Sequence, residues 1–314
     1  MSDSRLRPVL SIGECMVELA RGDDGRFDLA CGGDTFNMAV YLARAGCQVD
    51  YGTALGDDPY SSRIIAAARS EGVGTGLIEI MRDRSAGLYL IETNAAGERT
   101  FHYWRDQSPA RDLFEPGHGG TIVRAMSEAG VVLFSGITLS LYSARGLDRF
   151  ADALVMARAR GARIVMDGNY RPRGWRGDLE RARTTFDRFW RLADLALPTL
   201  EDEAMLWGTP TPSGVIERLR GLGVREIVVK LGEDGAFAAE DAAMSPFHVP
   251  VPSKVTAVDT SAAGDSFNAA YLAQRLKGAN VNDAVIAGHR LAGIVVQHRG
   301  AIAPREATEV AFDR

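Results

Sequence analysis

Small residues stand directly before a carboxylate at residues 259–267, in an order that suits phosphoryl transfer. The segment reads Asp-Thr-Ser-Ala-Ala-Gly-Asp-Ser-Phe, so residues 262–264 carry minimal side chains and precede Asp265. The valine-rich run at 249–258 predicts a strand before this segment, and the apolar spacing after it predicts a helix. The first backbone N–H groups of that helix would be open to an anion, with Asp265 beside them as a base.

A second glycine-rich segment opens a predicted helix near the N-terminus. Gly32-Gly33-Asp34-Thr35-Phe36-Asn37 leads into a helical pattern that ends at Gly46. The two glycines would let the backbone approach a ligand, and Asp34 and Asn37 can hydrogen-bond hydroxyl groups. A turn followed by an Asp N-cap is the simpler explanation when this segment is taken alone.

Polar or glycine-rich loops also follow three predicted strands. They are 167–171 (Asp-Gly-Asn-Tyr-Arg), 198–203 (Pro-Thr-Leu-Glu-Asp-Glu) and 230–235 (Lys-Leu-Gly-Glu-Asp-Gly). Open α/β sheets bind their ligands at the carboxyl ends of the strands, so together with the loop at 259 these four loops indicate one ligand site. Simpler explanations exist for each loop, such as a Thr199 N-cap or a hairpin turn at the glycines 232 and 235. The sequence has no GxxxxGK[ST] motif and no GxGxxG after a strand.

Strand-like and helix-like segments alternate along most of the 314 residues. This alternation predicts one α/β domain, residues 1–314, built on a doubly wound, mainly parallel sheet flanked by helices. Short apolar runs at 9–12, 131–134, 164–166, 195–197 and 227–229 predict strands buried on both faces. Stretches at 36–45, 61–70, 144–158 and 179–192 predict the helices between them.

Four further β-rich pieces interrupt the alternation and predict a small accessory sheet. Residues 87–93 and 99–105 read as a hairpin joined by 94–98, and 15–20 and 27–30 are shorter strand candidates. We expect these strands to be inserted at about 14–31 and 86–106.

Strand parity sorts the side chains of the hairpin by face. Phe101, Tyr103 and Arg105 share one face, and His102 and Trp104 share the other. One face is expected to cover a ligand, while the other either packs on a second subunit or covers the core.

Composition excludes several classes of function. A net charge of −5 without any basic block argues against a general nucleic-acid binder. The polar N-terminus is not a secretory signal, and no apolar run approaches the ~20 residues that span a bilayer, so we expect a cytoplasmic protein without membrane contact. The cysteines at 15, 31 and 47 are too few and too dispersed for a disulfide framework or a zinc knuckle.

With these segments the chain resembles the ribokinase-like (PfkB) carbohydrate kinases along essentially its whole length. Gly32 to Asn37, with Ala39, Gly46 and Gly56, fits the N-terminal signature of that family, and residues 259–265 fit the C-terminal one. One departure lies at Thr199-Leu200-Glu201-Asp202, where many relatives carry Asn-x-x-Glu. Within the family the similarity is greatest to kinases of sugar acids, through Gly13-Glu14 with Met16, Phe101–Arg105, Ala262-Ala263 and Gln297–Ala301.

The resemblance implies an enzyme that uses ATP and Mg²⁺, with the small sheet acting as a lid. Asp265 would take the proton from the attacking sugar hydroxyl. The backbone N–H groups of Ala262, Ala263 and Gly264 would form an anion hole for the phosphoryl group. Sugar-binding residues would be Gly33, Asp34, Asn37, Tyr89, Tyr103, Arg105, Arg171 and Asp265. Residues along the ATP path would be Asn169, Arg171, Thr199, Lys230, Gly232, Gly235 and Gly264. Asp202 would hold Mg²⁺ through water, and Asp259 and Ser261 would lie at a monovalent cation site for K⁺.

The two arginines indicate the acceptor. A planar guanidinium binds a carboxylate in a bidentate manner, so Arg105 and Arg171 favour an aldonate-type sugar acid over a neutral sugar. The alternative is that Arg105 only solubilises an edge strand. Other candidates are a kinase for fructose, ribose or a nucleoside, and a catalytically silent sugar-binding regulator, although an intact Asp265 and anion loop argue against the latter. Asp265 need not have a raised pKa, because a hydroxyl can lose its proton late in the transfer. A homo-oligomer, either a dimer through paired lids or a higher assembly, is a further expectation.

Overall fold

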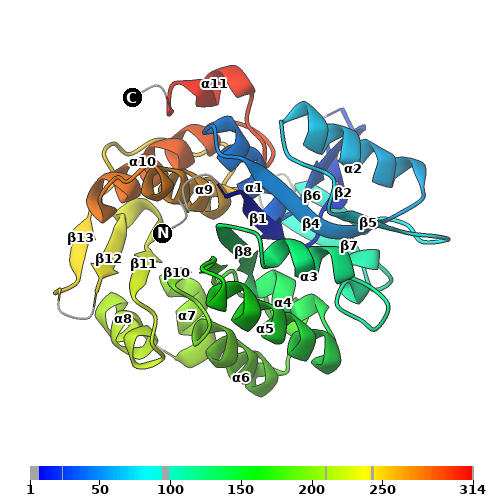
Figure 1. Cartoon of the computed structure of the whole chain (residues 1–314). Helices are drawn as coiled ribbons and strands as arrows, with labels where there is room; N and C mark the ends of the chain where they lie inside the picture. Colours follow the sequence, from blue (N-terminus) through cyan, green and yellow to red (C-terminus); the bar gives the residue numbers. More distant parts are fainter. Residues whose placement is uncertain (1–6, 23, 94–98, 209–210, 242–243, 313–314) are drawn as a thin grey trace.

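A nine-stranded sheet runs through the centre of the molecule in the order β13-β12-β11-β10-β9-β8-β1-β4-β5 (Figure 1). The computed structural model describes residues 7–22, 24–93, 99–208, 211–241 and 244–312. All pairs from β11 to β5 are parallel, while β12 and β13 form an antiparallel edge. The strands are β1 (Val9–Ile12), β4 (Val49–Gly56), β5 (Ile78–Met81), β8 (Val131–Ser135), β9 (Arg163–Asp167), β10 (Leu195–Leu197), β11 (Glu226–Lys230), β12 (Ala236–Glu240) and β13 (Phe247–Val249).

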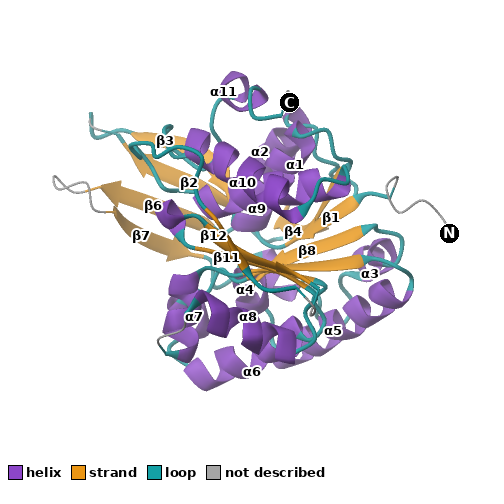
Figure 2. Ribbon diagram, turned by 90° about the vertical axis from the view of Figure 1, so that its left-hand side faces the viewer, coloured by secondary structure: helices purple, strands orange, loops and turns teal. Residues whose placement is uncertain are grey.

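Helices cover both faces of this sheet, as Figure 2 shows. The helices on one face are α1 (Asp34–Arg44), α2 (Pro59–Ser70), α9 (Ala263–Leu276) and α10 (Val281–Val295). On the other lie α3 (Gly120–Met126), α4 (Gly136–Leu141), α5 (Ala144–Ala159), α6 (Leu179–Trp190), α7 (Leu200–Trp207) and α8 (Pro212–Gly221), and α11 (Arg305–Glu309) ends the chain. Within the described ranges no helix is both long and apolar enough to cross a bilayer.

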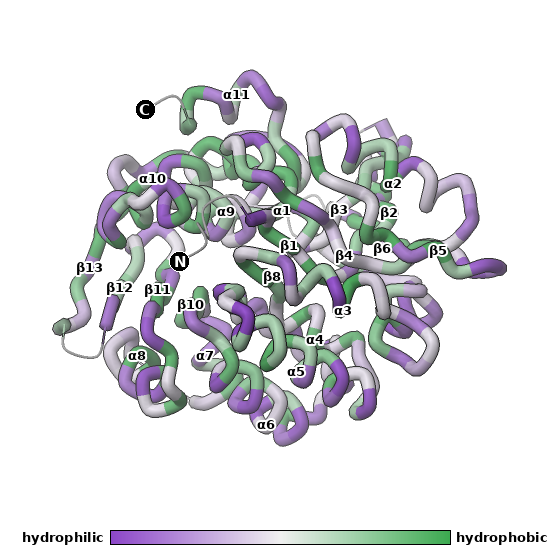
Figure 3. Tube along the Cα trace, in the orientation of Figure 1, coloured by the Kyte–Doolittle hydropathy of each residue, from purple (hydrophilic) through white to green (hydrophobic). Residues whose placement is uncertain are grey.

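Burial on both faces explains why the central strands read as unbroken apolar runs. Every residue of β1, β8, β10 and β11 is buried, because each strand has a helical layer above and below it. Figure 3 shows β8 as hydrophobic, whereas the outer helix α6 alternates between hydrophilic and hydrophobic positions. The predicted doubly wound sheet is confirmed.

A second sheet of four strands, the lid sheet, projects from the main body in the order β3-β2-β6-β7 (Figure 2). Its strands are β2 (Met16–Arg21), β3 (Phe27–Gly32), β6 (Leu88–Thr93) and β7 (Arg99–Trp104). The strands β6 and β7 pair in antiparallel fashion, as the predicted hairpin requires, and the expected turn at 94–98 lies outside the described residues.

The register of the lid sheet aligns three polar side chains across three strands. Glu18 of β2 lies opposite Tyr89 of β6, and Tyr89 lies opposite Tyr103 of β7. Trp104, which follows Tyr103 on β7, points to the opposite face of the lid sheet and is 59% exposed. The parity predicted for Tyr103 and Trp104 therefore matches the structure.

The strand predicted over 249–258 is wrong. β13 ends at Val249, and no strand follows among the described residues before α9. Pro250 and Pro252 have no N–H to donate to a sheet, and Val255 and Val258 are exposed rather than packed. The segment at 259 therefore reaches the site as a coil from the antiparallel edge of the sheet, and only three of the four expected loops follow strands directly.

Candidate functional site

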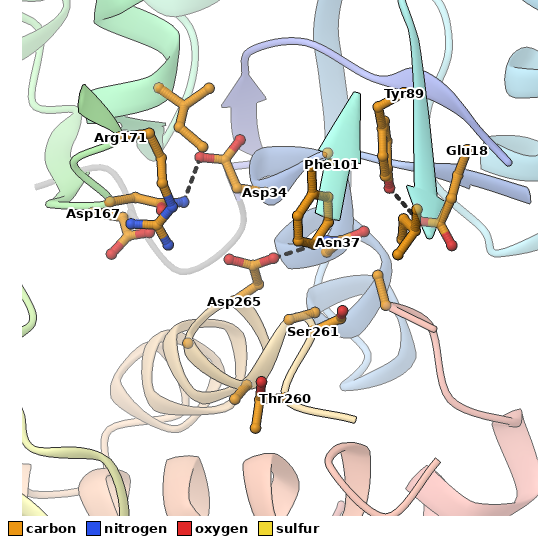
Figure 4. Close-up of a pocket in the computed structure, with 18 of the residues that line it drawn as sticks. Glu18, Asp34, Asn37, Tyr89, Phe101, Asp167, Arg171, Thr260, Ser261 and Asp265 are labelled. Atoms are coloured by element: carbon orange, nitrogen blue, oxygen red, sulfur yellow. Dashed lines mark hydrogen bonds between the residues drawn. The ribbon is translucent and has the colours of Figure 1, made fainter. Parts of the chain in front are cut away.

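A cleft of about 780 Å³ lies where the carboxyl ends of the parallel strands meet the lid sheet (Figure 4). It collects residues from both glycine-rich segments, from the lid sheet, from the loops after β9 and β10, and from the end of β11. Of the predicted site residues, those that line the cleft are Gly33, Asp34, Asn37, Tyr89, Tyr103, Arg105, Asn169, Arg171, Thr199, Asp202, Lys230, Asp259, Ser261, Ala262, Ala263, Gly264 and Asp265.

Two predicted ATP-binding residues, Gly232 and Gly235, are not among those that line the cleft. They lie in the turn between β11 and β12, where the Leu231 N–H donates to the Gly235 carbonyl at 2.9 Å. The simpler explanation of a hairpin turn is therefore correct for their local structure. Their contact with ATP stays a prediction.

The N-terminus of α9 is shaped by an unusual backbone conformation at Ala262. This residue has φ 56° and ψ 17°, a left-handed conformation that is uncommon outside glycine. The Ala263 N–H donates to the Thr260 carbonyl at 3.3 Å, while the N–H groups of Gly264 and Asp265 have no backbone acceptor among the described residues. The loop therefore presents free donors and the positive end of a 14-residue helix to the cleft.

Asp265 stands one residue after this loop, with its carboxylate directed at α1 (Figure 4). Its Oδ2 accepts a hydrogen bond from Asn37 Nδ2 at 2.8 Å, and the side chain is buried. Burial and then the negative charge of Asp34 raise the pKa of Asp265 to about 8, although Asn37 and Lys230 oppose the shift. We did not expect a raised pKa of Asp265 from the sequence, because the shift depends on how other residues pack around the carboxyl group. A carboxylate with a pKa near 8 accepts protons far more readily than a solvated one.

Asp34 and Asn169 join the two sides of the cleft. Asn169 Nδ2 donates to Asp34 Oδ2 at 2.9 Å, and the Thr35 N–H donates to Asp34 Oδ1 at 2.8 Å. Asp34 is the first residue of α1 rather than its N-cap, which is Gly33. A Cβ added to Gly33 would lie 2.1 Å from the Glu14 carbonyl, so close backbone approach requires glycine there.

Lys230 brings a buried positive charge next to the anion loop. Its Nζ contacts Asp167 Oδ1 at 2.8 Å and donates to Asn268 Oδ1 at 3.0 Å. A Cβ added to Gly264 would lie 3.7 Å from this Nζ, so the ammonium group flanks the start of α9. A negative group at the free N–H donors would also be attracted by Lys230.

Asp202 and Arg171 form an ion pair in the cleft. Asp202 accepts hydrogen bonds from the Tyr170 N–H at 3.2 Å and from Arg171 Nη1 at 3.1 Å, and burial raises its pKa. Thr199 is the N-cap of α7 and accepts from the Asp202 N–H, as the simpler explanation of this segment predicted. Arg171 is therefore held by Asp202, and both line the cleft.

The donor set around Asp202 suits Mg²⁺ better than a metal held by protein alone. No cluster of three or more His, Cys, Asp or Glu side chains able to hold a metal ion occurs among the described residues. Asp202 and Asp167 nevertheless line the same cleft and interact electrostatically. One or two carboxylates that share the ion with phosphate oxygens are the usual protein contribution to Mg²⁺ binding.

Asp259 ties the anion loop to the C-terminal segment. Its Oδ1 accepts from the Ser261 N–H and its Oδ2 from the Gly300 N–H, both at 2.7 Å. The carboxylate thus fixes the two loops between which the monovalent cation is predicted, and its ion-binding role stays a prediction.

The sequence did not assign three buried carboxylates that line the cleft, Glu14, Glu18 and Asp167. The Tyr89 hydroxyl donates to Glu18, and Arg105 forms an ion pair with Glu14. The sequence did carry a signal for Glu18. It lies two residues after Met16 on a predicted strand, so both side chains point to the same face of that strand. Glu14 stands in the Gly13-Glu14 motif of the resemblance and Asp167 in the strand-end loop at 167–171, but their partners Arg105 and Lys230 lie far away in the sequence, so their contacts could not be predicted.

Comparison with known proteins agrees with this geometry. The chain matches the pfkB family carbohydrate kinases over residues 7–308. It is 41% identical to 2-dehydro-3-deoxygluconokinase of Dickeya dadantii, over 94% of this chain and 96% of the relative. It is 40% identical to the enzyme of the same name from Escherichia coli, over 96% of this chain and 98% of the relative. A solved PfkB protein from a Polaromonas species superimposes with a TM-score of 0.82 at 26% identity, covering 93% of this chain and 96% of that one.

Proposed function

The chain belongs to the pfkB family of carbohydrate kinases, and on that premise we propose that it phosphorylates 2-keto-3-deoxygluconate (2-dehydro-3-deoxygluconate). ATP would be the phosphoryl donor and a primary hydroxyl the acceptor, which gives 2-keto-3-deoxy-6-phosphogluconate. The observation that carries the proposal is a single cleft with Asp265 and the free N–H groups of α9 at its floor and Arg105 on its lid wall. The names and the coverage of the two relatives support the choice of sugar.

Asp265 would act as the general base. With Oδ2 bound to Asn37, Oδ1 takes the proton of the acceptor hydroxyl. The hydroxyl oxygen attacks the terminal phosphorus of ATP, and the bond from that phosphorus to the bridging oxygen breaks, so that ADP leaves. The N–H groups of Ala262 and Gly264, joined by that of Asp265 and by Lys230, stabilise negative charge on the transferred phosphoryl oxygens. The Ala263 N–H, which was predicted to share this role, donates to the Thr260 carbonyl instead. Backbone donors of this kind need no reorganisation during the reaction, because the fold already holds them in place.

Mg²⁺ supplies charge neutralisation on the phosphates when it is bound. Asp202 would hold the ion through water, and Arg171 would bind phosphate from the same end of the cleft. A monovalent cation, K⁺, would bind beside Asp259 and Ser261 and stiffen the anion loop. Turnover in K⁺ compared with tetramethylammonium at equal ionic strength tests this point, and equal rates would exclude a requirement for K⁺.

We also propose a cytoplasmic, homo-oligomeric enzyme that pairs through its lid sheets. The outer face of the lid sheet carries the apolar side chains Leu29 and Trp104, which are 39% and 59% exposed. Exposed apolar side chains on one sheet face support an interface there. Light scattering after size-exclusion chromatography tests it, and a monomer at micromolar concentration would contradict it.

An ATP-turnover assay over a panel of acceptors tests the proposed function. The panel contains 2-keto-3-deoxygluconate, ribose, fructose, a nucleoside and an analogue of the sugar acid that lacks the carboxylate. We expect turnover with the sugar acid and little with the others. A preference for one of the neutral sugars would indicate a different kinase of the family, and no turnover with any acceptor would indicate a silent sugar-binding protein.

A further inference from the structure

A buried carboxylate, Glu14, stands behind the arginine that faces the proposed substrate. The Glu14 side chain is 1% exposed, and its Oε2 forms an ion pair with Arg105 Nη2. Arg105 comes directly after β7 and lines the cleft with a side chain that is 18% exposed. The pair thus joins the loop between β1 and β2 to the end of the hairpin.

The guanidinium of Arg105 keeps unused donors. Its Nε and Nη2 are buried and, like both Glu14 oxygens, make no hydrogen bond of ordinary alignment to any residue that the structure describes. Nη1 is not among these buried atoms and donates to none of the described residues, so its N–H groups are the ones open to the cleft. Arginine has five N–H donors, and Arg105 also lies 5.8 Å from the ring centre of Tyr103. Its plane is therefore fixed from two sides while hydrogen-bonding capacity remains.

Charged groups of both signs surround this pair. The pKa of Arg111 is lowered by burial, raised by Glu14 and lowered by Arg105, so all three lie close together. Asp106 and Arg176, which also act on Arg111, cancel each other in number. Asp34 also interacts electrostatically with Arg105, so two carboxylates face the two arginines. Recognition of a further carboxylate therefore rests on the hydrogen-bond geometry of Arg105 and not on an excess of charge.

The absence of a side chain at Gly87 leaves room for the Glu14 carboxylate. A Cβ added to Gly87 would lie 2.9 Å from Glu14 Oε1, so a larger residue there would displace the carboxylate. A buried ion pair is on average no more stabilising than a well-packed apolar pair of similar size. What the pair does supply is a fixed guanidinium on the cleft wall.

We propose that Glu14 is a positioning residue for the acid group of the substrate. It holds the Arg105 guanidinium against the wall of the cleft, and the remaining donors of Arg105 bind the carboxylate of the sugar acid. Glu14 acts through Arg105 and does not touch the substrate. The inference rests on the proposed sugar-acid kinase activity. It names Glu14 as the residue that fixes the orientation in which Arg105 recognises the acid group of the substrate.

Steady-state kinetics of Glu14→Gln test the proposal, because glutamine keeps the shape and removes the charge. We expect the KM for 2-keto-3-deoxygluconate to rise at least about tenfold, with kcat within about threefold and the KM for ATP unchanged. Glu14→Asp, which restores the charge, recovers part of the loss. A KM for the sugar acid within about twofold of wild type in a folded Glu14→Gln enzyme overturns the proposal.

A double-mutant cycle separates positioning from a general structural role. In an Arg105→Met background, adding Glu14→Gln leaves the KM for the sugar acid unchanged if Glu14 acts through Arg105. A further rise in KM in that background refutes the mechanism. The matched control is Glu226→Gln, since Glu226 is also buried and paired with Arg275 but lies on β11, away from the lid sheet. It should lower Tm without changing either KM.

The substrate preference of the wild-type enzyme distinguishes a failure of the proposed function from a failure of the role proposed for Glu14. A wild type that prefers a neutral sugar refutes the proposed function and the role of Glu14 with it. A wild type that prefers the sugar acid, combined with an unchanged KM in Glu14→Gln, refutes only the role of Glu14.

Discussion

Replacing Asp265 by asparagine should abolish most turnover and at the same time stabilise the protein. The neutral amide that Asp265→Asn introduces cannot take the proton of the acceptor hydroxyl, but its oxygen can still accept the hydrogen bond from Asn37. The substitution also removes a carboxyl group that is buried beside Asp34. Function and stability therefore change in opposite directions at this position.

The size of the stability gain follows from the pKa of Asp265. Its value rises from 3.8 to about 8 on folding, so between these pH values the folded state holds a proton that the unfolded chain has released. The free energy of unfolding then falls by about 1.4 kcal/mol per pH unit as pH rises through this range. At pH 7 the accumulated cost is about 4 kcal/mol, and the asparagine variant avoids it. Below pH 3.8 both states are protonated and the cost vanishes.

Two assays on one variant check this reasoning. Urea unfolding at pH 5, 7 and 8.5 should show the stability gain of Asp265→Asn increasing with pH, and kcat should fall by about 10²–10⁴-fold. If the variant keeps more than about a tenth of the wild-type kcat, Asp265 is not the base. If it is less stable than wild type at pH 8.5, the carboxyl group is not destabilised by burial.

Three further predictions concern the loop before Asp265, the pH dependence of catalysis and the C-terminal segment. Gly264→Ala should keep Tm, because the new Cβ meets only an ordinary contact, but should lower kcat in the kinase assay if phosphate approaches the N–H there; an unchanged kcat would argue against the anion hole. The kcat/KM of wild type should fall about tenfold per pH unit below about 8 as Asp265 is protonated; a flat profile down to pH 6 would contradict the raised pKa. Tyr41→Phe should lower the free energy of unfolding by about 1–3 kcal/mol, because its hydroxyl donates to the Ala301 carbonyl and accepts from the Ala303 N–H; urea unfolding would show it, and no loss would mean that water replaces the hydroxyl.

The pattern of residues within single segments was sufficient to predict those strands in which side chains alternate regularly or are uniformly apolar. The alternation of β7 placed Tyr103 toward the cleft and Trp104 away from it, because a strand has a side-chain period of two. The strands β1 and β10 were predicted with the bounds that the structure has, since each is a short apolar run buried on both faces. The segment β4 (Val49–Gly56) was missed, because its aspartate and two glycines hide the apolar run.

Pattern failed where burial depends on distant partners. The valines at 255 and 258 suggested a strand, but the described part of the fold leaves them exposed, and the prolines at 250 and 252 interrupt sheet pairing. The sequence showed Arg105 as an arginine on the ligand face but not its ion pair with Glu14, which is 91 positions earlier. The raised pKa of Asp265 likewise comes from packing and from Asp34. Spacing in one segment carries no information about such contacts.

The most direct test of the central claim is a competition experiment with wild-type enzyme. Equal concentrations of 2-keto-3-deoxygluconate and ribose share limiting ATP, and mass spectrometry measures the ratio of the two phosphorylated products, which equals the ratio of kcat/KM. A site that presents Arg105 to a carboxylate predicts at least about a hundredfold excess of the phosphorylated sugar acid. A product ratio near one would contradict a sugar-acid kinase.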